Sequence, residues 1–132
     1  EAVRKVNEAA SAKGLKVTAI RADLREWDLG ENRWDMILAA NMHTLVVEQA
    51  SRLVRALKPG GLLVVEGFHA DVRLATKFKG ILRVPQGHPT NQLTQLFSTL
   101  RILRYEDTFD AGRRAPGPPE APSRVHLVAV KE

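Results

Sequence analysis

The chain has 132 residues, of which 44% are hydrophobic and 27% charged, a balance typical of a folded globular domain and not of a disordered chain. Its length suits a single domain with a core of its own. It has no cysteine, which excludes disulfides, thiolate catalysis and Cys-based metal sites, and its 20 Lys and Arg against 15 Asp and Glu give a net charge of +5.

The positive charge is spread along the chain, and no run of adjacent basic residues is longer than the two of Arg113–Arg114. Because aromatic residues make up only 5%, the chain lacks an obvious base-stacking surface, and we expect no nucleic-acid partner. Apolar runs such as Met36–Ala40 are far shorter than the ~20 residues of a membrane span, and no secretory signal is visible. We therefore expect no membrane partner and a cytoplasmic location.

The first part of the chain predicts a helix and two strands. Apolar residues recur at helical spacing through Glu1–Lys13, and Gly14 stands where a glycine commonly ends a helix. The β-branched residues of Lys16–Arg21 predict a short strand. Trp34–Ala40 is apolar except for Asp35, which predicts a strand buried on both faces.

The middle of the chain predicts a helix, a sharp turn and a strand. Leu45–Leu57 has the apolar period of an amphipathic helix, and the Lys-Pro-Gly-Gly sequence of Lys58–Gly61 ends it. Leu62–Gly67 then predicts a second buried strand. Strand, helix and strand in this order form a βαβ unit, from which parallel α/β sheets are built.

The last part predicts a long loop, a helix and a hairpin. Residues 68–90 are basic and show no clear periodicity, which indicates a loop with short helical pieces. Thr90 or Asn91 could cap a following helix. Arg101–Phe109 and Arg124–Lys131 predict two antiparallel strands joined by a loop rich in Pro and Gly.

Three of these stretches form a recognisable series. They are Val17–Leu24, a strand ending in an Ala-Asp pair; Arg33–His43, a strand with the loop after it; and Leu57–Glu66, a helix end, a turn and a strand. In order and spacing they resemble the class I S-adenosylmethionine-dependent methyltransferases, in particular small bacterial ones similar to the tellurite-resistance methyltransferases. The resemblance implies an α/β fold with a Rossmann-like, mostly parallel sheet of strand order 3-2-1-4-5-7-6 and a C-terminal antiparallel hairpin.

The chain departs from this family at its glycine-rich loop. None of its nine glycines forms the G-x-G pattern that lies beside the methionine part of the cofactor, and the acidic residue that binds the ribose is also missing. Glu1–Val6 resembles the helix after the family's second strand. We therefore expect a single partial domain that lacks the first two strands and is inactive by itself. Its strand Trp34–Ala40 should have an open hydrophobic edge through which the chain could self-associate.

The resemblance implies S-adenosyl-L-methionine as cofactor, bound at the carboxyl ends of the strands. Asp23 is expected to accept a hydrogen bond from the adenine amino group, and the Leu24 backbone N–H to donate to a ring nitrogen. Ala39, Ala40 and Asn41 are expected to border the methionyl part. From its position alone, Asp23 could equally be the first residue of a turn.

Two histidines are the candidate catalytic residues. His43 could hold or deprotonate a methyl acceptor, since imidazole titrates near neutral pH, or it could equally cap the helix after it or be exposed to solvent. His69 could form an acid–base pair with Asp71. The segment 68–90 is expected to cover a small-molecule acceptor, for which its basic charge allows an anion. No His or Cys spacing indicates a metal site.

Two other functions stay open. Methyl transfer leaves few marks in a sequence, because the sulfonium is already reactive and alignment of the acceptor does most of the work. One alternative is a non-catalytic binding or interaction module on a remnant Rossmann-like sheet. The other is half of a nicotinamide-dependent enzyme, against which the absence of a G-x-G-x-x-G motif counts.

Overall fold

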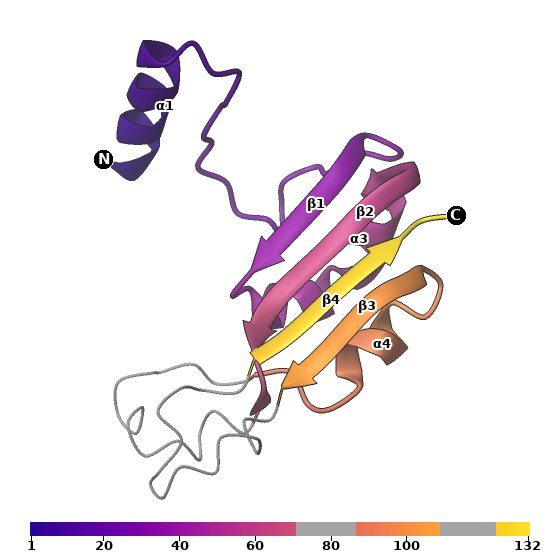
Figure 1. The fold of residues 1–132 in the computed structure, drawn as a ribbon. Helices are drawn as coiled ribbons and strands as arrows, with labels where there is room; N and C mark the ends of the chain where they lie inside the picture. The colour runs from indigo at the N-terminus through magenta and orange to yellow at the C-terminus, as the bar shows by residue number, and fades with distance from the viewer. Residues whose placement is uncertain (71–86, 109–123) are drawn as a thin grey trace, which may run out of the picture.

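The computed structural model describes residues 1–70, 87–108 and 124–132. These form one sheet and four helices. The strands are β1 (Trp34–Ala40), β2 (Leu57–Phe68), β3 (Arg101–Thr108) and β4 (Arg124–Val130), and the helices are α1 (Ala2–Ala12), α2 (His43–Glu48), α3 (Ala50–Ala56) and α4 (Gln92–Leu96). Figure 1 shows α3 and α4 behind the sheet, whereas α1 stands to one side, joined by an extended stretch of chain.

The strand order is β1-β2-β4-β3, so the last strand in sequence lies between β2 and β3. β1 and β2 are parallel, and β4 is antiparallel to both of its neighbours. The predicted C-terminal hairpin is therefore confirmed, and the order matches the 4-5-7-6 part of the sheet that the resemblance implies. A mostly parallel sheet is not confirmed, because only the β1–β2 pair of the described strands is parallel.

The predicted strand Lys16–Arg21 is wrong, since these residues belong to no strand. They are tied to α1 instead: the Asn7 side chain accepts from the Ala19 N–H at 2.7 Å and donates to the Ala19 carbonyl at 3.1 Å. A β-type sequence becomes a strand only where a neighbouring strand supplies partners for its backbone. β1 has β2 on one side, and its other edge is the end of the sheet, as expected.

The predicted helix Leu45–Leu57 is present but interrupted, with α2 and α3 meeting at Gln49. The start of β2, which follows α3 directly, depends on two glycines. Gly60 has a φ of +78°, and a Cβ on Gly61 would lie 2.9 Å from the carbonyl oxygens of Lys58 and Trp34. The Pro-Gly-Gly sequence thus forms the irregular start of β2, where the register with β1 shifts between Trp34 and Met36.

The core lies on one face of the sheet. Alternate residues of the central strands are buried there, including Leu63 and Val65 of β2 and Leu127 of β4, and they pack with Phe97 after α4. The residues between them in each strand point to the opposite face of the sheet. Figure 1 shows α3 and α4 behind the sheet, so neither helix covers that face. We call this surface the bare face; it comprises Met36, Leu38, Leu62, Val64, Val128 and Val130.

No helix among residues 1–70, 87–108 and 124–132 is long and apolar enough to cross a bilayer.

Candidate cofactor and acceptor site

The turn that follows Arg21 and the chain that leaves β1 enclose an open hollow. Its lining consists of Arg21, Ala22, Asp23, Leu24, Met42 and Leu45. The structure therefore brings the predicted residues Asp23 and Leu24 together with Met42, which comes just after the carboxyl end of β1. This is the edge at which α/β sheets commonly bind ligands.

Asp23 organises the turn on which it lies. Its Oδ1 atom accepts from the Arg25 N–H at 2.9 Å, and its carbonyl accepts from the N–H groups of Glu26 and Trp27 at 3.1 and 2.8 Å. The turn-forming role that the sequence left open is thus observed. A carboxylate has several acceptor positions, so this role leaves Asp23 able to accept a ligand's hydrogen bond as well.

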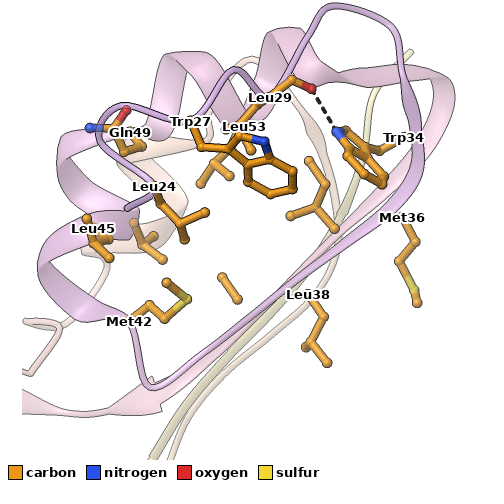
Figure 2. A pocket seen from close by; sticks show the side chains of 13 residues that line it. Leu24, Trp27, Leu29, Trp34, Met36, Leu38, Met42, Leu45, Gln49 and Leu53 are labelled. Atoms are coloured by element: carbon orange, nitrogen blue, oxygen red, sulfur yellow. Dashed lines mark hydrogen bonds between the residues drawn. The ribbon is translucent and has the colours of Figure 1, made fainter. Parts of the chain in front are cut away.

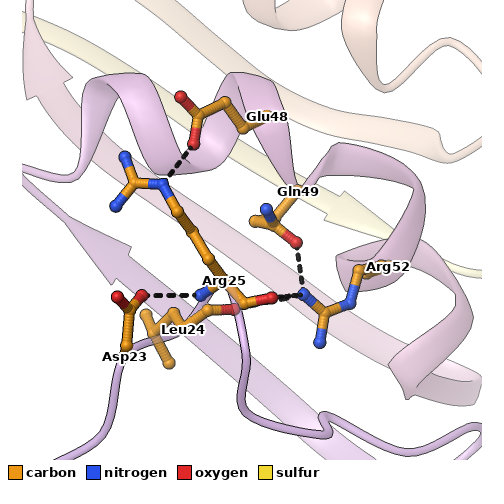
Figure 3. A network of polar contacts seen from close by, with 6 residues as sticks. All are labelled: Asp23, Leu24, Arg25, Glu48, Gln49 and Arg52. Atoms are coloured by element: carbon orange, nitrogen blue, oxygen red, sulfur yellow. Dashed lines mark hydrogen bonds and ion pairs between the residues drawn. The ribbon is translucent and has the colours of Figure 1, made fainter.

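Arg52 of α3 holds the same turn to the helices, as Figure 3 shows for part of the network. Its guanidinium donates to the carbonyl oxygens of Leu24 at 3.2 Å, Arg25 at 2.9 Å and Trp27 at 2.5 Å. The Arg25 side chain in turn donates to Glu48 of α2 at 3.0 Å. Charge-assisted bonds of this kind are stronger than neutral ones, so Arg52 fixes the turn that carries Asp23 and Leu24. Sequence reasoning missed Arg52.

The remaining predicted cofactor residues lie at the end of β1. Ala39 is buried on the helix side of the sheet and does not line the hollow. Ala40 and Asn41 are exposed and directly precede Met42. Asn41 has a φ of +56°, a conformation that Asn tolerates, and its N–H donates to the Glu66 carbonyl at 2.8 Å. This bond ties the end of β1 to β2.

His43 lies in a buried pair with His88, a histidine that the sequence did not single out. The rings of His43 and His88 have centroids 4.9 Å apart, and the side chains are only 7% and 1% exposed. A Cβ on Gly67 would lie 2.6 Å from Cε1 of His43, so only glycine leaves room for this ring. Gln92 holds His88 through a 2.9 Å contact between its Oε1 and the His88 Nδ1.

Burial makes both imidazoles weak bases. It lowers the pKa of His43, and the neighbouring His88 lowers the pKa of His43 further. Burial also lowers the pKa of His88, against the hydrogen bond to Gln92 that raises it. Both rings are therefore neutral at pH 7. Within the described part of the chain, both ring nitrogens of His43 and Nε2 of His88 have no hydrogen-bond partner.

His69 lies beside this pair but has different partners. Its Nε2 is 3.0 Å from Oγ1 of Thr90 and 3.6 Å from Oδ1 of Asp107. The predicted partner Asp71 lies outside the described residues, and Asp107 of β3 faces His69 in the structure. A β-bridge between His69 and His88 connects the two imidazole sites through the backbone. No described group of three or more His, Asp or Glu could hold a metal ion.

Solved structures with this arrangement identify the fold. The chain is similar to TehB from Haemophilus influenzae (TM-score 0.71, 14% identity, 98% of this chain and 46% of that one). It is also similar to a putative sarcosine dimethylglycine methyltransferase from Galdieria sulphuraria (0.72, 12%, 98% and 65%). A third match is an S-adenosylmethionine-dependent methyltransferase from Mesorhizobium loti (0.62, 18%, 96% and 76%). The fold is that of the class I methyltransferases.

The comparisons also limit what the class I methyltransferase fold implies here. No protein-family model and no curated protein matches the sequence. The chain spans less than two thirds of the length of TehB and of the Galdieria protein. Because the three identities lie between 12% and 18%, the likeness establishes the fold and leaves the reaction to be argued from the site.

Proposed function

We propose that this chain provides the adenine side and the acceptor side of an S-adenosyl-L-methionine-dependent methyltransferase acting on a small molecule. The observation that carries the proposal is the hollow at the carboxyl end of β1, where Asp23, Leu24 and Met42 meet. The methyltransferases among the solved structures of this fold support the same class of reaction. The proposed location is the cytoplasm.

The residues of the hollow suit an adenine ring. The Asp23 carboxylate can accept from an amino group, the Leu24 backbone N–H can donate to a ring nitrogen, and Met42 and Leu45 offer apolar walls. Ala40 and Asn41 at the end of β1 are the proposed border of the methionyl part. When bound, the cofactor would supply an electrophilic methyl group on a sulfonium.

The acceptor side is proposed to involve the histidines at the carboxyl end of β2. His43 and His88 are neutral at pH 7 because burial lowers their pKa values, and a neutral ring can accept a hydrogen bond or a proton from an acceptor's hydroxyl or amine. Because their ring nitrogens are buried in this structure, this proposed role requires the histidine pair to open. His69 is held by Thr90 and Asp107 and would orient the same molecule. An anionic acceptor stays a proposal, since the basic residues that motivate it fall in 71–86, outside the described ranges.

The chain lacks one part of such a site. None of its glycines forms a G-x-G pattern, so the backbone donors that would hold the methionyl part of the cofactor are not supplied by these residues. We therefore propose that the 132-residue chain alone binds the cofactor negligibly, and that activity belongs to a longer protein containing it.

The experiment is a calorimetric titration of the full-length gene product with S-adenosylhomocysteine and, separately, with NAD. We expect saturable binding of S-adenosylhomocysteine and none of NAD. Binding of NAD alone would assign the chain to nicotinamide chemistry. Uptake of neither ligand would favour the second candidate, a non-catalytic interaction module, which the open edge of β1 supports.

A further inference from the structure

A short backbone bridge joins the carboxyl end of β2 to the segment before α4. The His88 N–H donates to the Phe68 carbonyl at 2.8 Å, and the Ala70 N–H donates to the His88 carbonyl at 3.0 Å. The two segments cross so closely that a Cβ on Gly87 would overlap the His69 carbonyl group. Because this bridge is isolated from the ladders of the sheet, its stability depends on the side chains packed against it.

The His43–His88 pair packs against this bridge. Both rings lie over the same glycine: a Cβ on Gly67 would lie 2.6 Å from Cε1 of His43 and 3.1 Å from Cδ2 of His88. The His43 ring also meets the Phe68 ring, with 5.9 Å between the two centroids. Since His43 makes no side-chain hydrogen bond within the described residues, its packing is what holds α2 to the bridge.

The pair also connects the bridge to the hollow at the end of β1. His43 is the first residue of α2, and Met42 before it and Leu45 after it line the hollow. Met42 and Leu45 border an apolar cavity on the helix side of β1 as well, where Figure 2 shows them at the same end as Leu24. A change in the packing of His43 therefore moves the first turn of α2 and, with it, one wall of the hollow.

The closed pair offers no favourable place for an added proton. Oε1 of Gln92 can only accept, so Nδ1 of His88 carries the proton of that ring and Nε2 is a buried lone pair. A neutral His43 has one N–H, which is unpartnered in the part of the chain that the structure describes. A further proton would bury a charge beside the second imidazole, and on His43 the charge would lie at the positive end of the α2 dipole.

The acids and bases of the surrounding elements have other partners. Neither ring of the pair has a carboxylate as hydrogen-bond or ion-pair partner among the described residues, and α4 contributes only the uncharged Gln92. The charged or titratable groups of the other elements are Glu48 of α2 with Arg25, Glu66 of β2 with Arg124 of β4, Asp107 of β3 with His69 and Tyr105, and His126 of β4 in register with Glu66 and Glu106. No described carboxylate therefore compensates an imidazolium in the closed pair.

We propose that the His43–His88 pair is a proton-operated latch, in which protonation of either ring opens the bridge between the end of β2 and His88 and releases the first turn of α2. Acid opens the latch because an imidazolium is stable only where water reaches it. Opening exposes the ring nitrogens, as the acceptor role proposed above requires. The latch itself follows from the packing and does not depend on methyl transfer.

Amide exchange of the 132-residue chain at pH 7.5 and 5.5 tests the latch. An imidazole that has its ordinary pKa of 6.5 when the latch is open, and is neutral when it is closed, makes opening about ten-fold more frequent at the lower pH. We expect the protection factors of the Ala70 and His88 amides, which form the bridge, to fall by about ten-fold for each ring. The loss should not depend on urea below the unfolding transition, in contrast to exchange of the Val65 amide in the core, because local opening exposes little surface.

Three variants assign the response to the pair. His43→Phe and His88→Phe keep a flat ring that cannot take a proton, and each should lose about ten-fold of the pH response. His126→Gln is the matched control, because His126 is a titratable residue of β4 outside the pair, and it should keep the full response.

Three outcomes would overturn the latch. They are protection factors that are equal at the two pH values in the unmodified chain, a urea dependence of the bridge amides equal to that of Val65, and a full response in both His43→Phe and His88→Phe. The first two are measured on the unmodified chain, so they decide the question even where a variant does not fold.

Discussion

Replacing Arg52 with alanine should release the turn that carries Asp23 and Leu24 while leaving the rest of the sheet folded. The Arg52 guanidinium donates to the carbonyl oxygens of Leu24, Arg25 and Trp27, residues that lie 25 to 28 positions earlier in the chain. No other described side chain bonds these three oxygens. The substitution therefore removes the polar attachment of the turn to α3 in one step.

The size of the effect follows from the number and exposure of these bonds. A hydrogen bond to a charged donor contributes about 1.5–3 kcal/mol, and less where water can replace the donor. The turn is largely exposed, so most of the freed carbonyls can bind water, and the three bonds together should account for about 2 kcal/mol of local stability. That corresponds to about thirty-fold more frequent opening of the turn.

Amide exchange of Glu26 and Trp27 measures this opening, because their N–H groups bond the Asp23 carbonyl within the turn. We expect the thirty-fold increase in Arg52→Ala and a smaller one in Arg52→Lys, whose single ammonium cannot span three carbonyls. Arg55→Ala is the matched control, since Arg55 lies on the same helix and its side chain makes an exposed 3.9 Å ion pair with Glu31, with no other partner among the described residues. Unchanged exchange in Arg52→Ala, or an equal increase in Arg55→Ala, would refute the reasoning.

Three further predictions concern the candidate site. In the full-length product, Asp23→Ala should weaken S-adenosylhomocysteine binding about five- to hundred-fold by calorimetry, through loss of one adenine hydrogen bond; unchanged affinity would remove Asp23 from the site. Gly67→Ala should destabilise the chain by about 2 kcal/mol in urea unfolding, because the new methyl group overlaps the ring of His43, and a stability equal to that of the unmodified chain would contradict the packing. Folding lowers the pKa values of His43 and His88, so below pH 6.5 the unfolded chain binds more protons than the folded chain. The contribution of the two rings to stability should therefore be constant above pH 6.5. As the pH is lowered from 6.5, the free energy of unfolding should decrease by at most about 1.4 kcal/mol per pH unit for each ring. Urea unfolding at pH 7.5 and 5.5 checks this, and the same loss in a His43→Phe variant would show that His43 does not contribute.

Local patterns were sufficient to predict most of the sheet. The apolar runs of β1 and β2 and the alternation in β4 are properties of a few adjacent residues, and the hairpin of β3 and β4 follows from its Pro- and Gly-rich connection. The segment Lys16–Arg21 has the same local character but no neighbouring strand, which its own sequence cannot reveal. Gln49, where the helix is interrupted, fits the amphipathic pattern, so the sequence did not predict the interruption.

The candidate site was predictable only where it depends on position along a strand. Asp23, Leu24 and Asn41 were proposed because they follow strands or strand-like runs, and the structure places Asp23 and Leu24 in the lining of one hollow. The turn at Asp23 was one of two roles that its residue type allows. Arg52 and His88 were missed. Each acts on residues remote in sequence, and an arginine on a helix or a histidine in a loop carries no local mark of its partner.

The position of β4 sets the order in which this sheet can be completed. β4 follows β3 in the chain yet lies between β2 and β3, with its backbone paired to both. During synthesis on the ribosome, β3 therefore emerges before the strand it pairs with, and the sheet cannot close until Arg124–Val130 has left the exit tunnel. Lys131 then makes the final connection, with its Nζ donating to the Leu57 carbonyl at 2.8 Å. A chain that stops shortly before β4 would lose the strand that joins β2 to β3. The defect would lie in the middle of the sheet and not at its end.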